Sequence, residues 1–286
     1  MRYEAPETLD AAVQLLSSES GLAKILAGGT DLLVQLKTDL IEPDLVVDIK
    51  GIGELRTITE EAGGFRVGAA VTGAEMEEHA ALKNAWPGVV EGTNLIGSTQ
   101  IQGRATMGGN LCNGSPAADS VPGLIAAGAI ATVVGPKGKR DVPVEDIMIG
   151  PRKLSIAKDE FVVSFLLPAR KPKSADAYLR FIPRTEMDIA VVGVGVNLET
   201  DGSGKITAAR VGLGAVAPTP LLVGPAADAI IGTTLDKAAL DALDAAAQAA
   251  CKPINDKRGT IEYRTKVAGV IARRTAEIAY KRAGAK

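Results

Sequence analysis

The sequence predicts an α+β fold made of more than one domain. Its 286 residues exceed the usual length of a single domain. Near the N-terminus, a strand, a glycine pair, a helical turn and a second strand follow one another, which is typical of a small α/β unit. Beyond a polar, proline-bearing stretch at 169–174, three strands come in succession and helices then occupy the remainder. Strands followed by helices in this way indicate an α+β arrangement.

The N-terminal α/β unit is expected to begin with a helix at 8–18, for which Thr8 is the candidate N-cap. The strands of this unit are expected at 22–26 and 45–49. The first strand enters the pair Gly28-Gly29, where glycine allows a tight turn. Thr30 or Asp31 is then expected to cap a helical turn that ends near position 36.

The middle of the chain alternates hairpins with short helices. Expected hairpins pair 55–59 with 65–69 and 129–134 with 139–144, and a strand at 160–167 ends at Pro168. Helices are expected at 72–83, 87–95 and, with a weaker pattern, 117–127. The first of these helices begins with a capping box, in which Thr72 and Glu75 satisfy each other's backbone N–H groups.

The stretch 169–174 is the expected domain boundary. We expect an N-terminal domain at 1–173, with subdomains at about 1–54 and 55–173, and a C-terminal domain at 174–286. The C-terminal strands are expected at 177–182, 189–199 and 205–213, with helices from about 226 to 280.

Composition narrows the possible functions. A net charge of −2 gives no basic surface for nucleic acid. Two cysteines and one histidine provide neither a disulfide framework nor the ligand spacing of a metal site. The N-terminus lacks the apolar region of a signal peptide. The longest apolar run, 121–135, is short and interrupted by Pro122 and Gly123. We therefore expect a cytoplasmic protein without a membrane span.

Two glycine-rich segments are the most informative motifs. The first is Ala27-Gly28-Gly29-Thr30-Asp31, and the second is Thr106-Met107-Gly108-Gly109-Asn110. Glycine pairs let successive backbone N–H groups approach an anion closely, and the neighbouring hydroxyl and amide side chains add further donors. A glycine pair alone more often makes a simple turn, but two pairs with such neighbours favour one pyrophosphate held from two sides.

Common nucleotide motifs and acid–base groups do not explain these segments. The stretch 212–217 fits G-x-G-x-x-A, but Pro218 and Pro220 prevent the helix that a dinucleotide-binding motif requires. His79 is expected on a solvated helix face, and Cys112 as a small buried hydrophobe. A chain with cofactor loops and no evident catalytic acid or base indicates electron or hydride transfer, in which the cofactor supplies the chemistry.

The two segments, with Asn113-Gly-Ser-Pro-Ala-Ala-Asp119 after the second, resemble the FAD-binding (medium) subunit of the molybdenum hydroxylase family. That family includes the medium subunit of carbon monoxide dehydrogenase and the FAD domain of xanthine dehydrogenase. The opening at 3–9 and the stretch at 184–190 are also similar to the family. The resemblance implies a vanillyl-alcohol-oxidase (PCMH-type) FAD-binding fold of two subdomains, followed by a C-terminal β-meander and helix domain.

The resemblance also implies a set of cofactor-binding residues and no catalytic residue. These are Leu26, Ala27, Gly28, Gly29, Thr30, Asp31, Leu32, Leu33, Ile96, Thr106, Gly108, Gly109, Asn110, Asp119, Val162 and Arg180. Residues 26–33 would wrap the FAD pyrophosphate with backbone amides, and residues 106–110 would hold it from the other side. Asp119 would accept a hydrogen bond from the hydroxyl-bearing part of FAD. Ile96 would form an apolar wall, and Val162 would meet the cofactor through a strand backbone.

This chain departs from the family pattern at two places. Arg180 falls where relatives often carry lysine near the flavin, and a guanidinium keeps the charge with a different geometry. Gln102-Gly103 falls where relatives often have Arg-Asn. Since no histidine or cysteine occurs in the first loop, we expect non-covalent FAD.

Cysteine content bears on the partners that the family implies. Relatives pass electrons from a molybdenum centre through two [2Fe–2S] clusters to FAD, and such clusters need more thiolates than two cysteines provide. The resemblance therefore implies a large molybdopterin-binding subunit and a small [2Fe–2S] subunit, as a dimer of heterotrimers. FAD would pass the electrons to NAD⁺, a quinone or dioxygen. The alternatives are a free-standing FAD oxidase or dehydrogenase and a non-enzymatic nucleotide-binding subunit.

Overall fold

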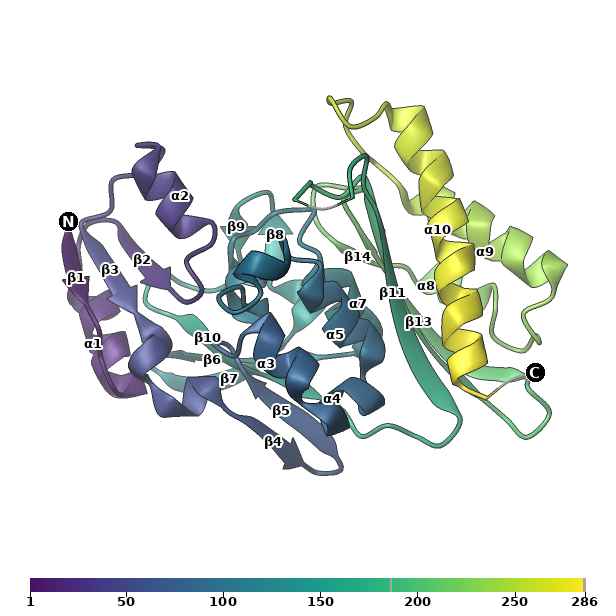
Figure 1. Cartoon of the computed structure of the whole chain (residues 1–286), viewed down its shortest axis with the longest axis horizontal. Helices are drawn as coiled ribbons and strands as arrows, with labels where there is room; N and C mark the ends of the chain where they lie inside the picture. The colour runs from purple at the N-terminus through teal and green to yellow at the C-terminus, as the bar shows by residue number, and fades with distance from the viewer. Residues whose placement is uncertain (186, 285–286) are drawn as a thin grey trace.

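A computed structural model describes residues 1–185 and 187–284 of the chain. Three parts follow one another along its long axis (Figure 1): a small N-terminal unit, a middle unit, and a C-terminal sheet covered by long helices. Glu186, within the stretch 184–190 singled out above, lies outside the described residues. Among the described residues, no helix is both long and apolar enough to span a membrane.

The N-terminal unit is a three-stranded parallel sheet in the order β1-β3-β2. Its elements are β1 (Arg2–Glu4), α1 (Leu9–Ser18), β2 (Ala23–Leu26), α2 (Leu32–Lys37) and β3 (Leu45–Asp48). Thr8 caps α1 as expected, because its hydroxyl accepts a hydrogen bond from the Ala11 N–H. Asp31 occupies the N-cap position of α2 but makes no capping hydrogen bond through its side chain. The expected capping role of Asp31 is therefore wrong.

The middle unit packs short helices on an antiparallel sheet of order β4-β5-β10-β6-β7. Its strands are β4 (Ile58–Glu61), β5 (Gly64–Gly68), β6 (Ile130–Gly135), β7 (Gly138–Pro143) and β10 (Phe161–Leu167), with a separate hairpin of β8 (Met148–Gly150) and β9 (Lys153–Leu154). Its α-helices are α3 (Gly73–Glu78), α4 (Ala80–Ala85), α5 (Pro87–Asn94), α6 (Met107–Cys112) and α7 (Ser120–Ala127). The hairpin of β6 and β7 follows the expectation closely.

Two expectations for the middle unit were wrong. The strand expected at 55–59 begins only at Ile58, because residues 53–56 form a 3₁₀ turn that buries Leu55 against the backbone of Gly68. The helix expected at 72–83 breaks at His79. The Nδ1 atom of His79 accepts a hydrogen bond from the Leu82 N–H and so caps α4, and its ring meets Phe65 edge-on. His79 is therefore a structural cap instead of a residue on a solvated face.

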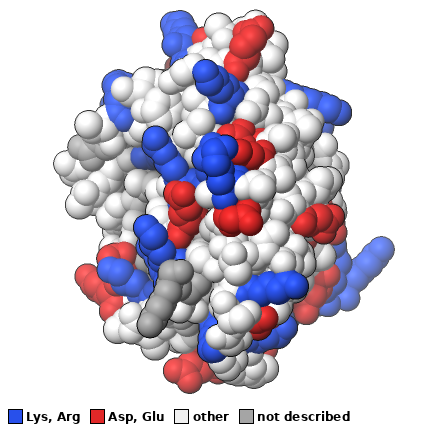
Figure 2. Space-filling model, turned by 90° about the vertical axis from the view of Figure 1, so that its right-hand side faces the viewer, with Lys and Arg blue, Asp and Glu red and all other residues white. Residues whose placement is uncertain are grey.

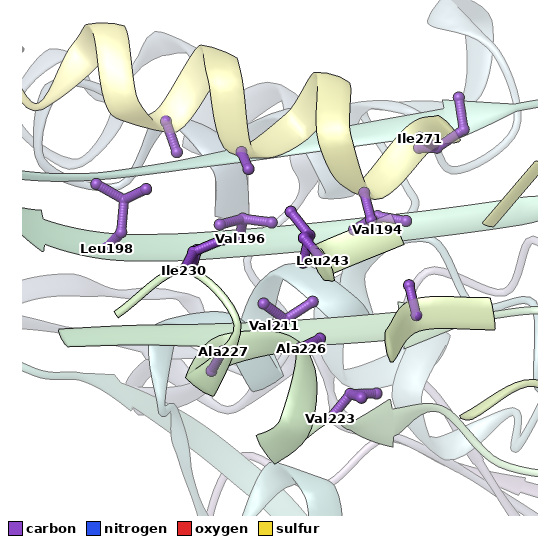
Figure 3. Packing of buried hydrophobic residues seen from close by; sticks show 14 of the residues in the cluster. Val194, Val196, Leu198, Val211, Val223, Ala226, Ala227, Ile230, Leu243 and Ile271 are labelled. Atoms are coloured by element: carbon purple, nitrogen blue, oxygen red, sulfur yellow. The ribbon is translucent and has the colours of Figure 1, made fainter. Parts of the chain in front are cut away.

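The C-terminal part is an antiparallel sheet in the order β11-β12-β13-β14, with helices against it. The elements are β11 (Ser174–Phe181), β12 (Val192–Thr200), β13 (Ile206–Gly214), β14 (Leu221–Leu222), α8 (Gly224–Asp228), α9 (Lys237–Ala250) and α10 (Ile261–Arg282). Figure 3 shows its core, where Val194, Val196 and Val211 of the sheet face α10 and the shorter helices. On the face shown in Figure 2, basic and acidic side chains are intermingled.

Glycines allow the middle and C-terminal parts to pack closely. Helix α7 crosses strands β12 and β13, and a Cβ on Gly195 or Gly212 would overlap the carbonyl oxygen of Pro122. Helix α5 packs on β11 in the same way, since a Cβ on Gly88 would collide with the backbone of Ala177. These close contacts bring β11 next to the segments that carry the glycine motifs.

Candidate functional site

The structure places the first glycine-rich segment against Arg104 and Ala105, directly before the second segment, although 78 positions separate Gly28 from Thr106. A Cβ on Gly28 would overlap the carbonyl oxygen of Arg104. The next residue, Gly29, has φ +77°, in the left-handed region that glycine adopts without strain. The backbone N–H groups of Gly28, Gly29, Thr30 and Asp31 have no hydrogen-bond partner among the described residues. The first segment thus presents a run of backbone donors, as an anion-binding turn requires.

The second segment is the start of a helix, not a glycine turn. Gly108 and Gly109 lie inside α6, and neither has a positive φ. Thr106 is the N-cap, and its hydroxyl accepts the Gly109 N–H at 2.9 Å. The N–H group of Gly108 has no partner among the described residues. This segment therefore presents its backbone donors through a helix start and not through a turn with positive φ.

The side chains of Asn110 and of the nearby Asn113 form hydrogen bonds with neighbouring elements of the protein. Asn110 Oδ1 accepts hydrogen bonds from the backbone N–H and the hydroxyl of Ser120, at 3.0 and 2.7 Å. Asn113 Oδ1 accepts one from Gln35 of α2 at 3.3 Å. Burial raises the pKa of Asp31, against the opposing effects of Arg152 and Asn113. Together these contacts tie α2, α6 and the start of α7 to one another.

Asp119 and Arg180 form a buried ion pair at the start of α7. Arg180 Nη1 donates to Asp119 Oδ2 at 2.8 Å and to the carbonyl oxygen of Leu95 at 2.7 Å. Tyr178 completes the cluster, because its hydroxyl donates to Asp119 Oδ1 at 3.1 Å. Burial raises the pKa of Asp119 to about 6, although Arg180 and Tyr178 both lower it. A carboxylate has about four acceptor positions, so Asp119 can still accept a hydrogen bond from a ligand hydroxyl.

The remaining expected site residues differ in how deeply their side chains are buried. Ile96 follows Leu95 directly and is buried, which suits an apolar wall. The side chain of Val162 packs in the core of the middle unit, so only its backbone, next to an irregularity in the pairing of β10 with β6, can meet a ligand. Leu26 is buried at the end of β2, whereas the side chain of Leu33 is half exposed on α2.

Groups for acid–base or metal chemistry do not gather here. No cluster of three or more His, Cys, Asp or Glu side chains that could hold a metal ion occurs within residues 1–185 and 187–284. Burial raises the pKa of the Cys112 thiol to about 12, so it stays protonated and cannot serve as a thiolate. The region offers hydrogen-bond donors, one ion pair and apolar surface.

These features fit FAD in three respects. Unpartnered N–H groups from two segments suit the two phosphates of a pyrophosphate. The Asp119 carboxylate suits a sugar or ribityl hydroxyl. Ile96 is an apolar side chain that directly follows Leu95, whose carbonyl oxygen binds the cationic Arg180, as the wall of an aromatic-ring site requires.

Comparison with known families and proteins agrees with this geometry. Residues 1–170 match the family described as the FAD-binding domain in molybdopterin dehydrogenase, and residues 177–279 match the carbon monoxide dehydrogenase flavoprotein C-terminal domain. The chain belongs to this family of FAD-binding oxidoreductase subunits, and FAD is its cofactor.

Relatives with the same architecture are found at moderate sequence identity. The chain is 36% identical to the carbon monoxide dehydrogenase medium chain of Afipia carboxidovorans, over 98% of this chain and 97% of that protein. It is 31% identical to the xanthine dehydrogenase FAD-binding subunit of Escherichia coli O157:H7, over 99% and 97%. Among solved structures, Cu,Mo-CO dehydrogenase in its cyanide-inactivated form superposes with a TM-score of 0.94 at 36% identity, covering 99% of this chain and 98% of that chain.

Sequence reasoning missed three residues that organise the site. Tyr178 holds Asp119, Ser120 holds Asn110, and Gln35 links α2 to Asn113. Ser120 directly follows the quoted motif, so its position was a usable signal. Tyr178 gave no signal, because it reaches Asp119 only when β11 packs beside α7.

Proposed function

We propose that this chain relays electrons within a multi-subunit molybdenum hydroxylase, from [2Fe–2S] clusters on a partner subunit through FAD to an external acceptor. The observation that carries the proposal is the close contact between Gly28 and the Arg104 carbonyl oxygen. This contact brings the unpartnered N–H groups of residues 28–31 near the start of α6. FAD, when bound, supplies the redox chemistry and can exchange electrons singly or in pairs. The chain's own residues bind and orient it.

Within this proposal, the two glycine-rich segments, Asp119, Arg180 and Ile96 have binding roles. The backbone of residues 26–33 and the helix start at 106–110 hold the pyrophosphate, and the helix start adds its dipole. Asp119 accepts a cofactor hydroxyl. Arg180, fixed by Asp119 and by Leu95, would place a guanidinium next to the apolar wall at Ile96 and orient Asp119 toward the cofactor.

The proposed partner subunits follow from the small number of cysteines in this chain. Two cysteines cannot ligate two [2Fe–2S] clusters, so the clusters and the molybdopterin belong to a small and a large partner subunit. We propose a dimer of heterotrimers in the cytoplasm, with NAD⁺, a quinone or dioxygen as acceptor. We also propose that 1–173 and 174–286 are the two domains, with subdomains at about 1–54 and 55–173.

Co-purification tests this function. The chain, tagged and expressed in its native host, is expected to bring down two partners, with molybdenum, iron and one FAD per chain. In the complex, substrate should bleach the flavin absorbance near 450 nm, a property of the cofactor. A lone chain, free of metal, that oxidises an organic substrate by itself would support the free-standing FAD enzyme instead. A chain that stays colourless after incubation with FAD would support the non-enzymatic alternative.

Gly109→Val is expected to abolish FAD binding while the chain still folds. A Cβ at Gly109 would meet only the Thr106 hydroxyl, at 3.0 Å, so a larger side chain there extends toward the site instead of the core. The measurement is flavin retention after gel filtration, with circular dichroism to verify the fold.

Gly108→Ala provides the contrast for this variant. A Cβ there would lie 2.5 Å from the Ala69 carbonyl oxygen. Gly108→Ala should therefore lower the melting temperature of the chain, whereas Gly109→Val should not. A yellow Gly109→Val protein would show that the start of α6 does not contact FAD.

A further inference from the structure

Tyr178 is a buried residue of the C-terminal sheet that reaches into the FAD-binding part of the chain. It lies on β11, two positions before Arg180, and 3% of its surface is exposed. Its hydroxyl donates to Asp119 Oδ1, while Arg180 donates to Asp119 Oδ2. Both oxygens of one carboxylate are therefore held by residues of a single strand.

The surroundings of Tyr178 leave room for its hydroxyl and fix its backbone. A Cβ on Gly193 of the neighbouring strand would lie 2.5 Å from the Tyr178 oxygen, so glycine at that position creates the necessary space. The backbone N–H of Tyr178 donates to Glu91 Oε2 at 3.0 Å. Glu91 is in turn paired with Arg282 at the end of α10. Tyr178 is thus fixed from α5, from β12 and, through Glu91, from α10.

The hydroxyl must be a donor in this arrangement. Burial and the charge of Asp119 raise the pKa of Tyr178 well above its ordinary value, so the proton stays on the oxygen. An ionised acceptor strengthens this hydrogen bond relative to one between neutral groups. Without the hydroxyl, Asp119 Oδ1 would lose its only protein donor among the described residues, and the carboxylate could rotate about its pairing with Arg180.

We propose that Tyr178 is a positioning residue for FAD, which acts by holding the Asp119 carboxylate in the orientation that accepts the cofactor hydroxyl. This inference rests on the proposed contact between Asp119 and FAD. It means that the C-terminal part contributes to cofactor binding through β11, beyond covering the site.

Tyr178→Phe tests the proposal in the full chain, stripped of flavin and titrated with FAD. The variant is expected to raise the dissociation constant by about 10-fold, the usual effect of losing a hydrogen bond to a charged group. Tyr280→Phe is the matched control. It removes a partly buried hydroxyl that donates to the Gly204 carbonyl oxygen, in the same C-terminal part but away from Asp119, and should leave FAD affinity unchanged.

A double-mutant cycle separates positioning from a general structural effect. If Tyr178 acts through Asp119, adding Tyr178→Phe to Asp119→Asn should weaken FAD binding little beyond Asp119→Asn alone. The proposal would be overturned if the two substitutions raised the dissociation constant for FAD by independent factors, so that the double variant showed the product of the two single effects. A Tyr178→Phe chain that fails to fold while Tyr280→Phe folds would also overturn it, because the hydroxyl would then serve folding. If the unmodified chain does not bind FAD at all, the proposed function fails, whereas normal FAD binding by Tyr178→Phe refutes only the role of Tyr178.

The pH dependence of binding supplies a second readout. The charged or titratable groups nearest Asp119 are Arg180 and Tyr178 on β11, with the Glu91–Arg282 pair behind them. Because a cofactor hydroxyl prefers the ionised carboxylate, FAD affinity should fall as the pH drops below about 6, the pKa of Asp119. The Tyr178 hydrogen bond lowers that pKa, so the midpoint should move to higher pH in Tyr178→Phe. An unmoved midpoint would contradict the proposal.

Discussion

Gly28→Ala should weaken FAD binding by about 10- to 100-fold without unfolding the chain. The added methyl group would overlap the Arg104 carbonyl oxygen, so the first segment would have to move away from the second. Overpacking of this kind costs about 1–3 kcal/mol, which corresponds to that range of dissociation constants when the strain acts on the binding arrangement. Titration of the flavin-free chain with FAD, followed by flavin fluorescence, measures the effect.

Gly103→Ala is the matched control for this experiment. It makes the same substitution one residue away from Arg104, in a turn where a Cβ would have no neighbour within 4 Å. FAD affinity should be unchanged. Equal affinities for Gly28→Ala and the unmodified chain would show that FAD does not depend on the contact between Gly28 and Arg104.

Asp176→Ala should lower the free energy of unfolding by about 3–5 kcal/mol, the usual cost of removing one partner from a buried ion pair. Asp176 Oδ1 accepts from Arg170 Nη2 at 2.6 Å, and its other oxygen accepts from the Val89 N–H near the start of α5. Arg170 also stacks on the ring of Trp86 and donates to the Ala85 carbonyl oxygen. The variant would leave Arg170 Nη2 and a helix N–H without their acceptor and the guanidinium without its counter-charge. Chemical denaturation measures the loss.

Lys171→Ala is the control for the ion pair. Lys171 neighbours Arg170 and pairs with Glu199 at 3.1 Å, but its side chain is 69% exposed. Exposed pairs contribute about 0–1 kcal/mol, so this variant should unfold almost as the unmodified chain does. A loss below about 1 kcal/mol for Asp176→Ala would show that the pair does not hold β11 to α5.

The stretch 169–174 shows contacts that its sequence pattern does not indicate. Its proline and basic residues are typical of a linker, and the chain does change character there. In the structure, Arg170 is fixed by Asp176, Asn197, Ala85 and Trp86 at once. The pairing partners come from three different elements, and no local pattern can indicate that they converge on one guanidinium.

The glycine segments illustrate what local sequence does convey. Glycine pairs flanked by hydroxyl and amide groups indicated close backbone approach, and Gly28 shows it. The same pattern did not reveal that Gly108 and Gly109 are helical, because Thr106 caps α6 through a hydrogen bond that a glycine turn would not need. His79 was misjudged for a similar reason, since its capping role depends on the break between α3 and α4.

The sequence by itself determined the class of fold, the order of most elements and the family, because these depend on local periodicity, turn residues and motifs of fixed spacing. Only the tertiary structure decided which groups meet. Gly28 touches Arg104 because it has no Cβ, and Tyr178 and Arg180 bind Asp119 where glycines at 195 and 212 let α7 pack closely on the C-terminal sheet. Such contacts depend on the packing of segments far apart in the chain, where backbone clearance and the burial of charge, instead of local preference, set the geometry.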